Sequence, residues 1–422
     1  MFVIYDLICL LMIIIYLPVY IFKGKLHAGL KERLGFLPVR HFGNKPVWIH
    51  AVSVGEAVSL RNIFSELKTK YPAKDFVVST VTRAGNRIVR NFTSEKELVT
   101  YLPLDFSFVV KKVIDKIDPS LFIIAETELW PNLISYLHRK NVPVIIINGR
   151  ISDRSYKGYS LIKFLVRPLL DKVACVGTQT QDDAARFVRL GLREDRVRVT
   201  GNLKFDQKVS NEDKKAQEAL KVKLDLVPAD KLFVCGSTHP GEEEIILNAF
   251  GQVSPDFPDL RLVIAPRHAE RAKEVQKISS RLGFNGIFVS QSVKRCDTCI
   301  PKQIYILDSV GSLINLYAIA DYVFVGGSLI KKGGHNILEP AIFAKPIIFG
   351  PNMFNFKEIA DLFIKDDASI LVRNEGDLVE ALRSLLDDPT KASVLGEKAR
   401  ALLLKNQGAT KKDLELIEGY LR

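Results

Sequence analysis

Acidic side chains follow two apolar runs in the first half of the chain, where they could serve as bases. Glu56 closes the run HAVSVGE, and Glu126 and Glu128 come directly after the apolar residues 121–125. A carboxylate held beside a hydroxyl group can take its proton as the oxygen attacks an electrophile. Two structural alternatives stay open. Ser53 and Glu56 match a capping box, and Glu128, with Glu126 less suited, could be a first-turn acid that complements a helix dipole.

Paired glycines follow an apolar run in the second half of the chain. Residues 326–327 are Gly-Gly directly after the run 321–325, and residues 333–334 are Gly-Gly before a helix-compatible stretch that holds Glu339. Glycine lets backbone N–H groups approach a ligand, and a helix N-terminus carries partial positive charge. The pattern therefore suits a phosphate with its nucleoside, whose sugar hydroxyls Glu339 could bind. A glycine-rich turn between strand and helix is the alternative.

Cations lie at two further expected strand ends. Arg267 and His268 follow the apolar run 262–265 and Pro266, a position from which a cation can hold a phosphate. Lys204, in the run GNLKFD, would ordinarily be a solvated lysine near a linker. The second half of the chain is thus expected to bind an anion.

The sequence offers no convincing metal site. Cys296 and Cys299 form a lone C-x-x-C without a second pair of ligands, and no D-x-D-type acidic pair lies in a nucleotide loop. The five cysteines, few and odd in number, favour a reducing compartment over a disulfide framework. We therefore predict chemistry that needs neither a metal nor another cofactor.

Continuous apolar runs alternate with helix-patterned stretches, which is typical of parallel strands covered on both faces. The first set of predicted strands is Val47–Ala51, Phe76–Thr80, Leu98–Leu102, Leu121–Ala125, Val144–Ile147, Val173–Val176 and Val197–Val199. The second set is Leu232–Cys235, Leu262–Ala265, Ile287–Val289, Ile304–Leu307, Tyr322–Val325, Ile347–Phe349 and Ile370–Val372. We predict an α/β protein with two doubly wound domains in series.

Ligands in such sheets lie beyond the carboxyl ends of the strands, where the strand order switches. If each half winds in the order 3-2-1-4-5, its first and fourth strands are neighbours. In the first half, the loops of Glu56 and Glu126 would then face one crevice. In the second half, the loops 236–240 and 326–328 would meet in a similar manner. One domain would offer carboxylates and the other small, backbone-rich loops.

Length and charge narrow the class of protein. The 422 residues, 47% hydrophobic and 26% charged, can bury two ordinary cores. A net charge of +12 favours an anionic partner. Arg83, Arg87 and Arg90 share one helix face, which suits anionic lipid headgroups or is simply solvated. No motif supports nucleic-acid binding.

The predicted segments are a membrane anchor with a basic juxtamembrane part (1–44), a Rossmann-like domain (45–207), a linker (208–230), a second Rossmann-like domain (231–389) and a helical tail (390–422).

Residues 2–22 are almost continuously apolar and predict one N-terminal transmembrane helix. About 21 helical residues span roughly 32 Å, which matches a bilayer core. Asp6 lies near one end, where it could reach the headgroups, and nothing resembles a signal-peptide cleavage site. Cations first appear at Lys23, so the positive-inside rule places residues 23–422 in the cytoplasm. A buried core helix is the alternative, disfavoured by the lack of an amphipathic period.

Seven motifs in order along the chain carry a resemblance to a known family. They are HAVSVGE (50–56), AETELWPN (125–132), INGR (147–150), GNLK (201–204), GSTH (236–239), APRH (265–268) and GGHNILEP (333–340). With the N-terminal anchor, they make the chain similar to the 3-deoxy-D-manno-octulosonic acid (Kdo) transferases of lipopolysaccharide assembly. The resemblance covers the chain from residue 1 to about residue 350.

This resemblance implies a GT-B glycosyltransferase, with two Rossmann-like domains facing a cleft. It implies CMP-Kdo as donor, bound by the second domain, and a lipid A precursor as acceptor, bound by the first, on the cytoplasmic face of the bacterial inner membrane. Glu56 would be the general base, and Glu126 and Lys204 would assist the transition state. The implied CMP contacts are Pro266, Arg267, His268, Val310, Gly311, Ser312, Asn336, Ile337, Leu338 and Glu339.

Two rival functions stay open at the level of the sequence. The first is another GT-B enzyme, such as a UDP-sugar transferase or an epimerase, which a comparison of CMP and UDP binding would reveal. The second is a membrane-tethered binder of anionic lipid without enzymatic activity, whose function would not depend on Glu56.

Overall fold

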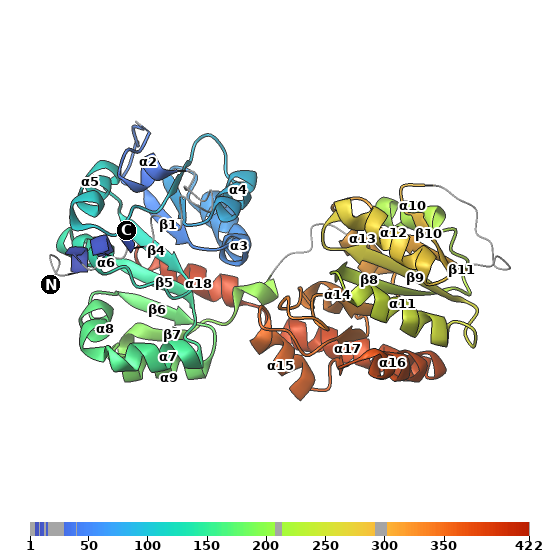
Figure 1. Cartoon of the computed structure of the whole chain (residues 1–422). Coiled ribbons are helices and arrows are strands. Elements are labelled where there is room, and N and C mark those ends of the chain that lie inside the picture. Colours follow the sequence, from blue (N-terminus) through green and yellow to red (C-terminus); the bar gives the residue numbers. More distant parts are fainter. Residues whose placement is uncertain are drawn as a thin grey trace. The chain divides into compact units, whose positions relative to one another are not determined.

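A computed structural model describes residues 5–7, 9–11, 14–15, 29–38, 40–206, 213–291 and 302–421. The chain divides into two compact units (Figure 1). Unit 1 comprises Met1–Lys208 and Asn406–Arg422, and unit 2 comprises Val209–Lys405. Each unit is built on a parallel sheet with helices on both faces, so the predicted pair of doubly wound α/β layers is confirmed.

The sheet of unit 1 has the strand order β3-β2-β1-β4-β5-β6-β7. Its strands are β1 (Val47–Ala51), β2 (Phe76–Thr80), β3 (Leu98–Tyr101), β4 (Leu121–Ala125), β5 (Val144–Gly149), β6 (Cys175–Thr178) and β7 (Val197–Val199). Its helices are α2 (Leu30–Arg33), α3 (Val54–Lys70), α4 (Arg83–Phe92), α5 (Ser107–Ile117), α6 (Pro131–Arg139), α7 (Asp153–Leu161), α8 (Lys163–Leu170), α9 (Gln181–Leu190) and α18 (Ala409–Glu418), with short 3-10 turns η1 (Glu194–Arg196) and η2 (Leu203–Asp206). The predicted adjacency of the first and fourth strands is confirmed, because β1 pairs with β4.

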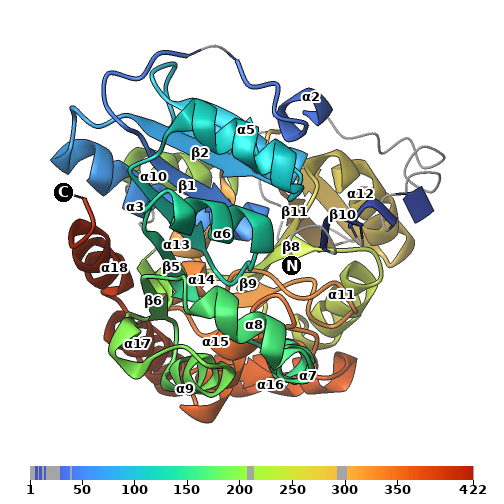
Figure 2. The ribbon, with the colours of Figure 1, turned by 90° about the vertical axis from the view of Figure 1, so that its left-hand side faces the viewer.

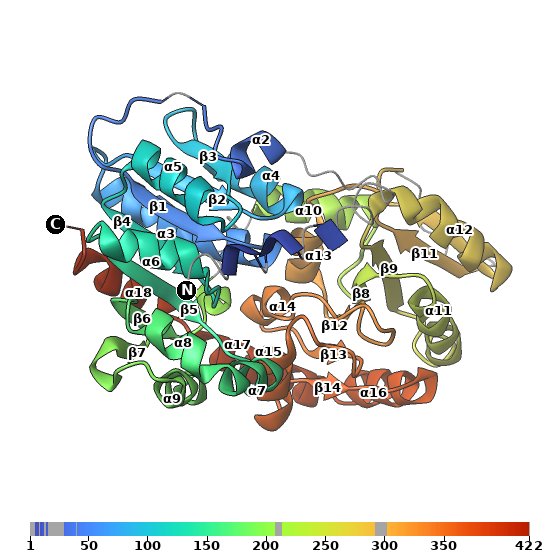
Figure 3. The ribbon, with the colours of Figure 1, turned by 60° about the vertical axis from the view of Figure 1, so that its left-hand side comes forward.

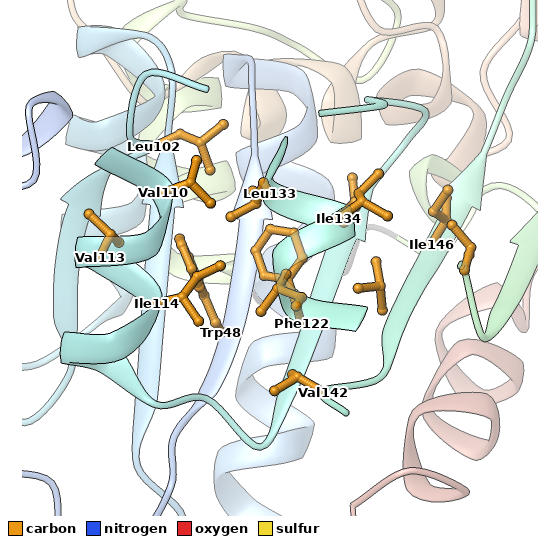
Figure 4. Packing of buried hydrophobic residues seen from close by; sticks show 14 of the residues in the cluster. Trp48, Leu102, Val110, Val113, Ile114, Phe122, Leu133, Ile134, Val142 and Ile146 are labelled. Carbon is orange, nitrogen blue, oxygen red and sulfur yellow. The ribbon is translucent and has the colours of Figure 1, made fainter. Parts of the chain in front are cut away.

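Two apolar layers enclose this sheet. On one face, α5 and α6 cover Trp48 and Phe122 with residues such as Ile114 and Leu133 (Figure 4). The view in Figure 3 shows these two helices in front of β1 and β4. On the other face, α3, α4 and α18 contribute to a second cluster. Burial on both faces explains why the strands are continuous rather than alternating apolar runs.

The sheet of unit 2 has the strand order β10-β11-β9-β8-β12-β13-β14. Its strands are β8 (Lys231–Thr238), β9 (Leu260–Pro266), β10 (Phe284–Phe288), β11 (Lys302–Ile306), β12 (Tyr322–Val325), β13 (Ile347–Phe349) and β14 (Ile370–Leu371). Its helices are α10 (Lys214–Lys223), α11 (Glu242–Val253), α12 (Ala272–Arg281), α13 (Leu313–Ile319), α14 (Leu338–Ile342), α15 (Lys357–Lys365), α16 (Glu375–Asp387) and α17 (Pro389–Lys405), with the 3-10 turn η3 (Ala269–Arg271).

The predicted order 3-2-1-4-5 is wrong for unit 2. The fourth strand, β11, lies between the second and the third, because it pairs with both β9 and β10. The fifth strand, β12, therefore takes the place beside β8. The loops after β8 and β12 meet all the same, as expected. Strand order depends on which helices cross over which face, a long-range choice that the apolar runs do not encode.

The segment expected as one helical tail, 390–422, is divided between the units. Helix α17 packs on α14 and α16 within unit 2. Helix α18 belongs to unit 1 and lies against α3 and β6 (Figure 2). The end of the chain thus completes the unit with which the chain began.

The described N-terminal residues 5–7, 9–11 and 14–15 are helical. The Asp6 carboxylate accepts hydrogen bonds from Ser107 N at 3.1 Å and from Asn132 Nδ2 at 2.7 Å. Asp6 therefore binds protein groups at the starts of α5 and α6, not lipid headgroups as its position in the sequence had indicated. Among the described residues, no helix combines the length and apolar character needed to cross a bilayer. Much of the predicted span, residues 2–22, lies outside them.

Candidate functional site

The first acidic loop begins helix α3. Ser53 is its N-cap, and the Glu56 carboxylate accepts from Val52 N at 2.6 Å and from Ser53 N at 3.2 Å. Ser53 Oγ in turn accepts from Glu56 N at 3.3 Å, so the capping box is present. Each carboxylate oxygen carries more than one acceptor site. Glu56 can therefore close the helix start and still accept a proton, and the two interpretations of this residue are compatible.

Glu126 and Glu128 emerge from β4, directly beside the strand that leads to Glu56. Glu126 has a φ of 60°, a left-handed conformation that non-glycine residues seldom adopt and that clusters at functional sites. Burial, followed by the charges of Glu56 and Glu126, raises the pKa of Glu128 to about 7. Helix α6 has no acid in its first turn, so the alternative that these residues complement its dipole is wrong.

His50, at the start of the first motif, has a structural role. It is fully buried in β1, and its Nδ1 lies 3.1 Å from Ser79 O. Burial lowers its pKa to about 3, so the ring is neutral at physiological pH and Nδ1 donates to that carbonyl. His50 therefore supports the strand beneath the acidic loops and does not exchange protons with a ligand.

Lys204 lies on η2 at the same edge of the sheet. Its backbone N–H donates to Asn202 Oδ1 at 2.9 Å, and the neighbouring Leu203 N–H donates to Asn148 Oδ1 at 3.1 Å. Asn148 is in β5, the strand next to β4, and has a φ of 53°. The turn of Lys204 is thus fastened to the strand beside that of Glu126.

Three histidines gather at the carboxyl edge of the sheet of unit 2. His239 Nε2 lies 2.9 Å from His335 Nε2, and their rings stack with centroids 5.2 Å apart. His268 meets His239 edge-on at 6.4 Å. Burial and the charge of Arg267 lower the pKa of His335 to about 4, and burial also lowers the pKa of His239. The pair is therefore neutral, and one ring donates to the other.

Arg267 and Glu339, both predicted to contact a nucleotide, belong to this group. The Arg267 side chain is exposed, and its backbone N–H donates to Thr238 O at 2.9 Å. Asn336 Nδ2 donates to Glu339 Oε1 at 3.3 Å. Burial raises the pKa of Glu339, while Asn336 and Arg267 oppose the rise. A cation, an amide and a carboxylate are thus held together beside the histidine pair.

The other predicted CMP contacts differ in accessibility. The side chains of Ile337 and Leu338 are buried in the core, as is Pro266, so only their backbones could meet a ligand. Val310 is 92% exposed in the loop between β11 and α13, where Gly311 has a φ of 95°. Ser312 is the N-cap residue of α13. This loop follows the strand next to β9, which leads to Arg267.

The backbone N–H groups of the glycine-rich loop after β12 do not face a ligand as predicted. The Glu242 carboxylate accepts from the backbone N–H groups of Gly327 at 2.6 Å and of Ser328 and Leu329 at 2.9 Å. A protein carboxylate therefore occupies the donors that a phosphate was expected to use. A Cβ at Gly326 would lie 2.6 Å from Ser237 O, so this glycine is needed for close packing of β12 on β8.

A further expectation about this region is wrong. Helix α14 has only five residues, so its start offers little of the dipole expected after the second glycine pair. Helix α11 begins after Gly241, which provides no side-chain cap. Glu243 accepts from Thr238 Oγ1 at 3.1 Å and pairs with Arg271 at 2.7 Å, and thus belongs to a buried network rather than to a solvated first turn.

The described residues hold no group of three or more His, Cys, Asp or Glu side chains arranged for a metal ion. Cys296 and Cys299 lie outside those residues.

Arg90 was expected on an exposed basic face with Arg83 and Arg87. Its Nε donates to Asn86 Oδ1 at 2.9 Å, a bond within its own helix. Anionic lipid binding by this face stays a prediction.

The sequence reasoning named Glu128 as a possible base, but nothing in the sequence signalled its burial. It missed two groups that the structure brings to the edge of unit 2. His239 and His335, 96 residues apart, form a pair through β8 and β12. Glu242 reaches the glycine loop by a contact across 85 residues. The GSTH and GGHN motifs were the available signal for the histidine pair, because both follow apolar runs.

Comparison with known proteins places the chain in a family. Residues 28–207 match the profile described as 3-Deoxy-D-manno-octulosonic-acid transferase (kdotransferase). The 3-deoxy-D-manno-octulosonic acid transferase of Haemophilus influenzae is 33% identical over 403 residues, covering 93% of this chain and 91% of that protein. The enzyme of the same description from Chlamydophila psittaci is 29% identical over 99% of this chain and 96% of that protein.

Among solved structures, the UDP-GlcNAc 2-epimerase of Neisseria meningitidis bound to UDP-GlcNAc aligns with a TM-score of 0.58 over 89% of this chain and 99% of that chain. Its sequence identity of 13% shows a shared GT-B-like fold and does not favour epimerase chemistry. The family profile and the relatives over nearly the full length agree. The chain belongs to the 3-deoxy-D-manno-octulosonic acid transferase family.

Proposed function

We propose that this enzyme transfers Kdo from CMP-Kdo to a lipid A precursor, with unit 2 holding the donor and unit 1 activating the acceptor. The observation that carries this division is the contrast between the two carboxyl edges. Three coupled carboxyl groups, those of Glu56, Glu126 and Glu128, lie in unit 1. Arg267 and a histidine pair lie in unit 2. Transfer brings a donor held by one unit to an acceptor bound by the other.

On the acceptor side, a sugar hydroxyl is a poor nucleophile and needs a positioned base. Glu56 takes this proton in our proposal, because backbone N–H groups fix its carboxylate at the start of α3. Glu126 lies at the end of the neighbouring strand, where its charge would stabilise the oxocarbenium character of the Kdo carbon. Glu128, with a pKa near neutrality, is the second candidate for the base.

On the donor side, the departing CMP gains negative charge on its phosphate. Arg267 is exposed at the end of β9 and suits a bidentate contact to this phosphate. Glu339 and Asn336 offer an acceptor and an amide for ribose hydroxyls or for the base. Lys204 of unit 1 is the second cation that we propose to assist the transition state. These groups supply the electrostatic stabilisation of the leaving group, and the proposed reaction uses no metal and no further cofactor.

The lipid acceptor places the reaction at the cytoplasmic face of the inner membrane. We propose that residues 2–22 attach the enzyme to this membrane, because they are almost continuously apolar and cations follow from Lys23 onward. The hydrogen bonds of Asp6 to the starts of α5 and α6 keep the beginning of this segment on unit 1. Added protease should then spare the enzyme in sealed spheroplasts and digest it after lysis. Digestion in sealed spheroplasts would contradict this topology.

The decisive experiment incubates the purified enzyme with CMP-Kdo and a tetraacyl lipid A precursor and reads the product by mass spectrometry. The expected product gains the mass of one or more Kdo residues and appears together with CMP. UDP-sugars serve as the control donors. Product from a UDP-sugar alone, or isomerisation of a UDP-sugar, would favour the rival enzymes. Lipid binding without turnover, unaffected by Glu56→Gln, would favour the non-enzymatic membrane protein.

A further inference from the structure

The C-terminal helix α18 is fastened to the turn that carries Lys204. Asp206, the last residue of η2, accepts from Gly408 N at 2.7 Å through Oδ1 and from Thr410 N through Oδ2. Gln407 Nε2 donates to Phe205 O at 3.2 Å. The residues that follow Lys204 are therefore bonded directly to the start of α18. A displacement of this helix would pull on the turn.

The residues that precede Lys204 are fixed from the opposite direction. Asn148 Oδ1 accepts from Leu203 N, and Asn202 Nδ2 donates to Gln179 Oε1 at 2.8 Å. Gln179 Nε2 donates to Asn148 O at 3.0 Å, which closes the network on the end of β5. The turn is thus held between the ends of β5 and β6 on one side and α18 on the other.

Asp413 lies where these two sides meet. It is on α18, its exposed fraction is 0%, and it belongs to no ion pair among the described residues. A Cβ at Gly177 of β6 would lie 2.6 Å from Asp413 Oδ1, so the carboxyl group packs directly on that strand. The Thr200 hydroxyl and the backbone N–H of Asn148 lie near the carboxyl group. Neither carboxyl oxygen has a partner of good hydrogen-bond geometry.

The surroundings of Asp413 favour its neutral form. Burial, with a further contribution from the charge of Asp206, raises its pKa to about 7, and Thr200 and Asn148 offset this only in part. Burial raises the pKa of the Cys175 thiol of β6, and the charge of Asp413 adds to the rise. On the side of α3, Glu66 and Lys411 line a groove between that helix and α18. Lys204 and Asp206 are the titratable groups on η2.

We propose that Asp413 is a positioning residue for the turn that carries Lys204. This proposal rests on the proposed role of Lys204 in the transfer. With a proton, the carboxyl group stays packed between Gly177, Thr200 and Asn148, and α18 holds Asp206 in place. Without the proton, a charge would be buried beside Asp206. The strain is relieved when α18 moves outward, and the turn then loses one of its two supports.

The stability that Asp413 contributes has a defined direction with pH. Its pKa in the folded protein is raised above the ordinary value of 3.8 to about 7. The contribution is therefore complete below pH 3.8 and is lost as the pH rises through about 7. Turnover that depends on the position of Lys204 should decline as the pH rises through about 7, where Asp413 of the folded protein ionises, without loss of the folded state.

Asn mimics the protonated carboxyl group in shape and charge, which provides the test. Steady-state kinetics of the full-length enzyme with CMP-Kdo and lipid acceptor should be measured from pH 6 to pH 9. Asp413→Asn should match the wild type at pH 6 and lack the part of the alkaline decline due to Asp413. Asp413→Ala should lower kcat by roughly tenfold or more at every pH with little change in KM, since small displacements of a catalytic group carry such costs. Glu415→Gln, an exposed acid on the same helix, is the matched control and should behave as the wild type.

Hydrogen exchange of the amides in residues 202–206 provides a readout that does not need Lys204 to be catalytic. Protection factors there should fall above pH 7 in the wild type and in Glu415→Gln, but not in Asp413→Asn. The proposal would be overturned if the alkaline decline of turnover persisted unchanged in Asp413→Asn. It would also be overturned if Asp413→Ala only unfolded at a lower temperature and kept a normal kcat. Normal turnover of Lys204→Ala would instead refute the role of Lys204, while the pH-dependent protection of the turn would stand.

Discussion

Substitution of Glu56 by Gln separates its two roles, because the structure gives each a different magnitude. Gln keeps one carbonyl oxygen but presents an NH₂ group where the second carboxylate oxygen accepts from the backbone. One hydrogen bond to a charged group is lost, which costs about 1.5–3 kcal/mol. At roughly 2–4 °C per kcal/mol for a unit of this size, the midpoint of thermal unfolding should fall by about 3–12 °C.

Turnover should fall far more than this loss of stability explains. Loss of a general base costs about 10²–10⁴ in kcat, equivalent to about 2.7–5.5 kcal/mol of barrier. The assay is the rate of Kdo transfer at a temperature well below the unfolding midpoint, with CMP binding measured in parallel. CMP affinity should be unchanged, because the proposed donor contacts lie in unit 2.

Ser53→Ala is the matched control for this experiment. It removes the hydroxyl that accepts from Glu56 N and leaves the carboxylate intact. The loss of this N-cap should cost about 1 kcal/mol of stability without a decrease in kcat. If Glu56→Gln and Ser53→Ala both melt earlier and both turn over at the wild-type rate, Glu56 is a capping residue alone and the general-base proposal fails.

Three further predictions follow from the two edges. Arg267→Ala and Glu339→Ala should each weaken CMP binding about tenfold, or about 1.4 kcal/mol, and leave lipid binding intact. Calorimetry measures both affinities. Equal loss of affinity for both ligands would contradict the assignment of the donor to unit 2. Glu242→Ala leaves four backbone N–H groups without their acceptor, those of His239, Gly327, Ser328 and Leu329. It should destabilise unit 2 by about 3–5 kcal/mol in thermal unfolding, whereas Glu242→Gln should cost less. An unchanged midpoint of unfolding would refute the role of this carboxylate. Because the pKa of Glu128 is raised to about 7, its protonated form stabilises the fold below about pH 4.5, and this contribution is lost as the pH rises through 7. Glu128→Gln should therefore flatten the pH dependence of stability and of kcat/KM between pH 6 and pH 8. An unaltered pH profile would remove Glu128 as a candidate base.

The sequence was sufficient to predict the parts of the fold that depend on local pattern. Buried parallel strands are continuous apolar runs, so β1, β2 and β4 could be bounded to the residue. Once the first and fourth strands are neighbours, the loops of Glu56 and Glu126 must share one edge. These predictions rest on strand burial and on the position of the loops after the strands, both of which a single sequence reveals.

Other features depend on contacts between distant segments, and the sequence did not reveal them. Three adjacent glutamates after Gly241 look like solvated helix-start acids, but Glu242 is buried on the glycine loop and Glu243 pairs with Arg271. Whether such a carboxylate meets solvent or a distant backbone depends on the tertiary packing of β12 beside β8. The insertion of β11 between β9 and β10 and the return of α18 to unit 1 are long-range features of the same kind.

That return has a consequence for how the protein is made. Helix α18 supplies Ala409 and Ile417 to one of the two apolar clusters of unit 1. A ribosome adds about 5–20 residues per second, so the roughly 200 residues of unit 2 take on the order of 10–40 s to synthesise. Throughout this interval the nascent unit 1 exposes the surface that α18 will cover. Unit 2 can complete its core first, although it is encoded second, and a chain truncated before residue 406 leaves its N-terminal half permanently unfinished.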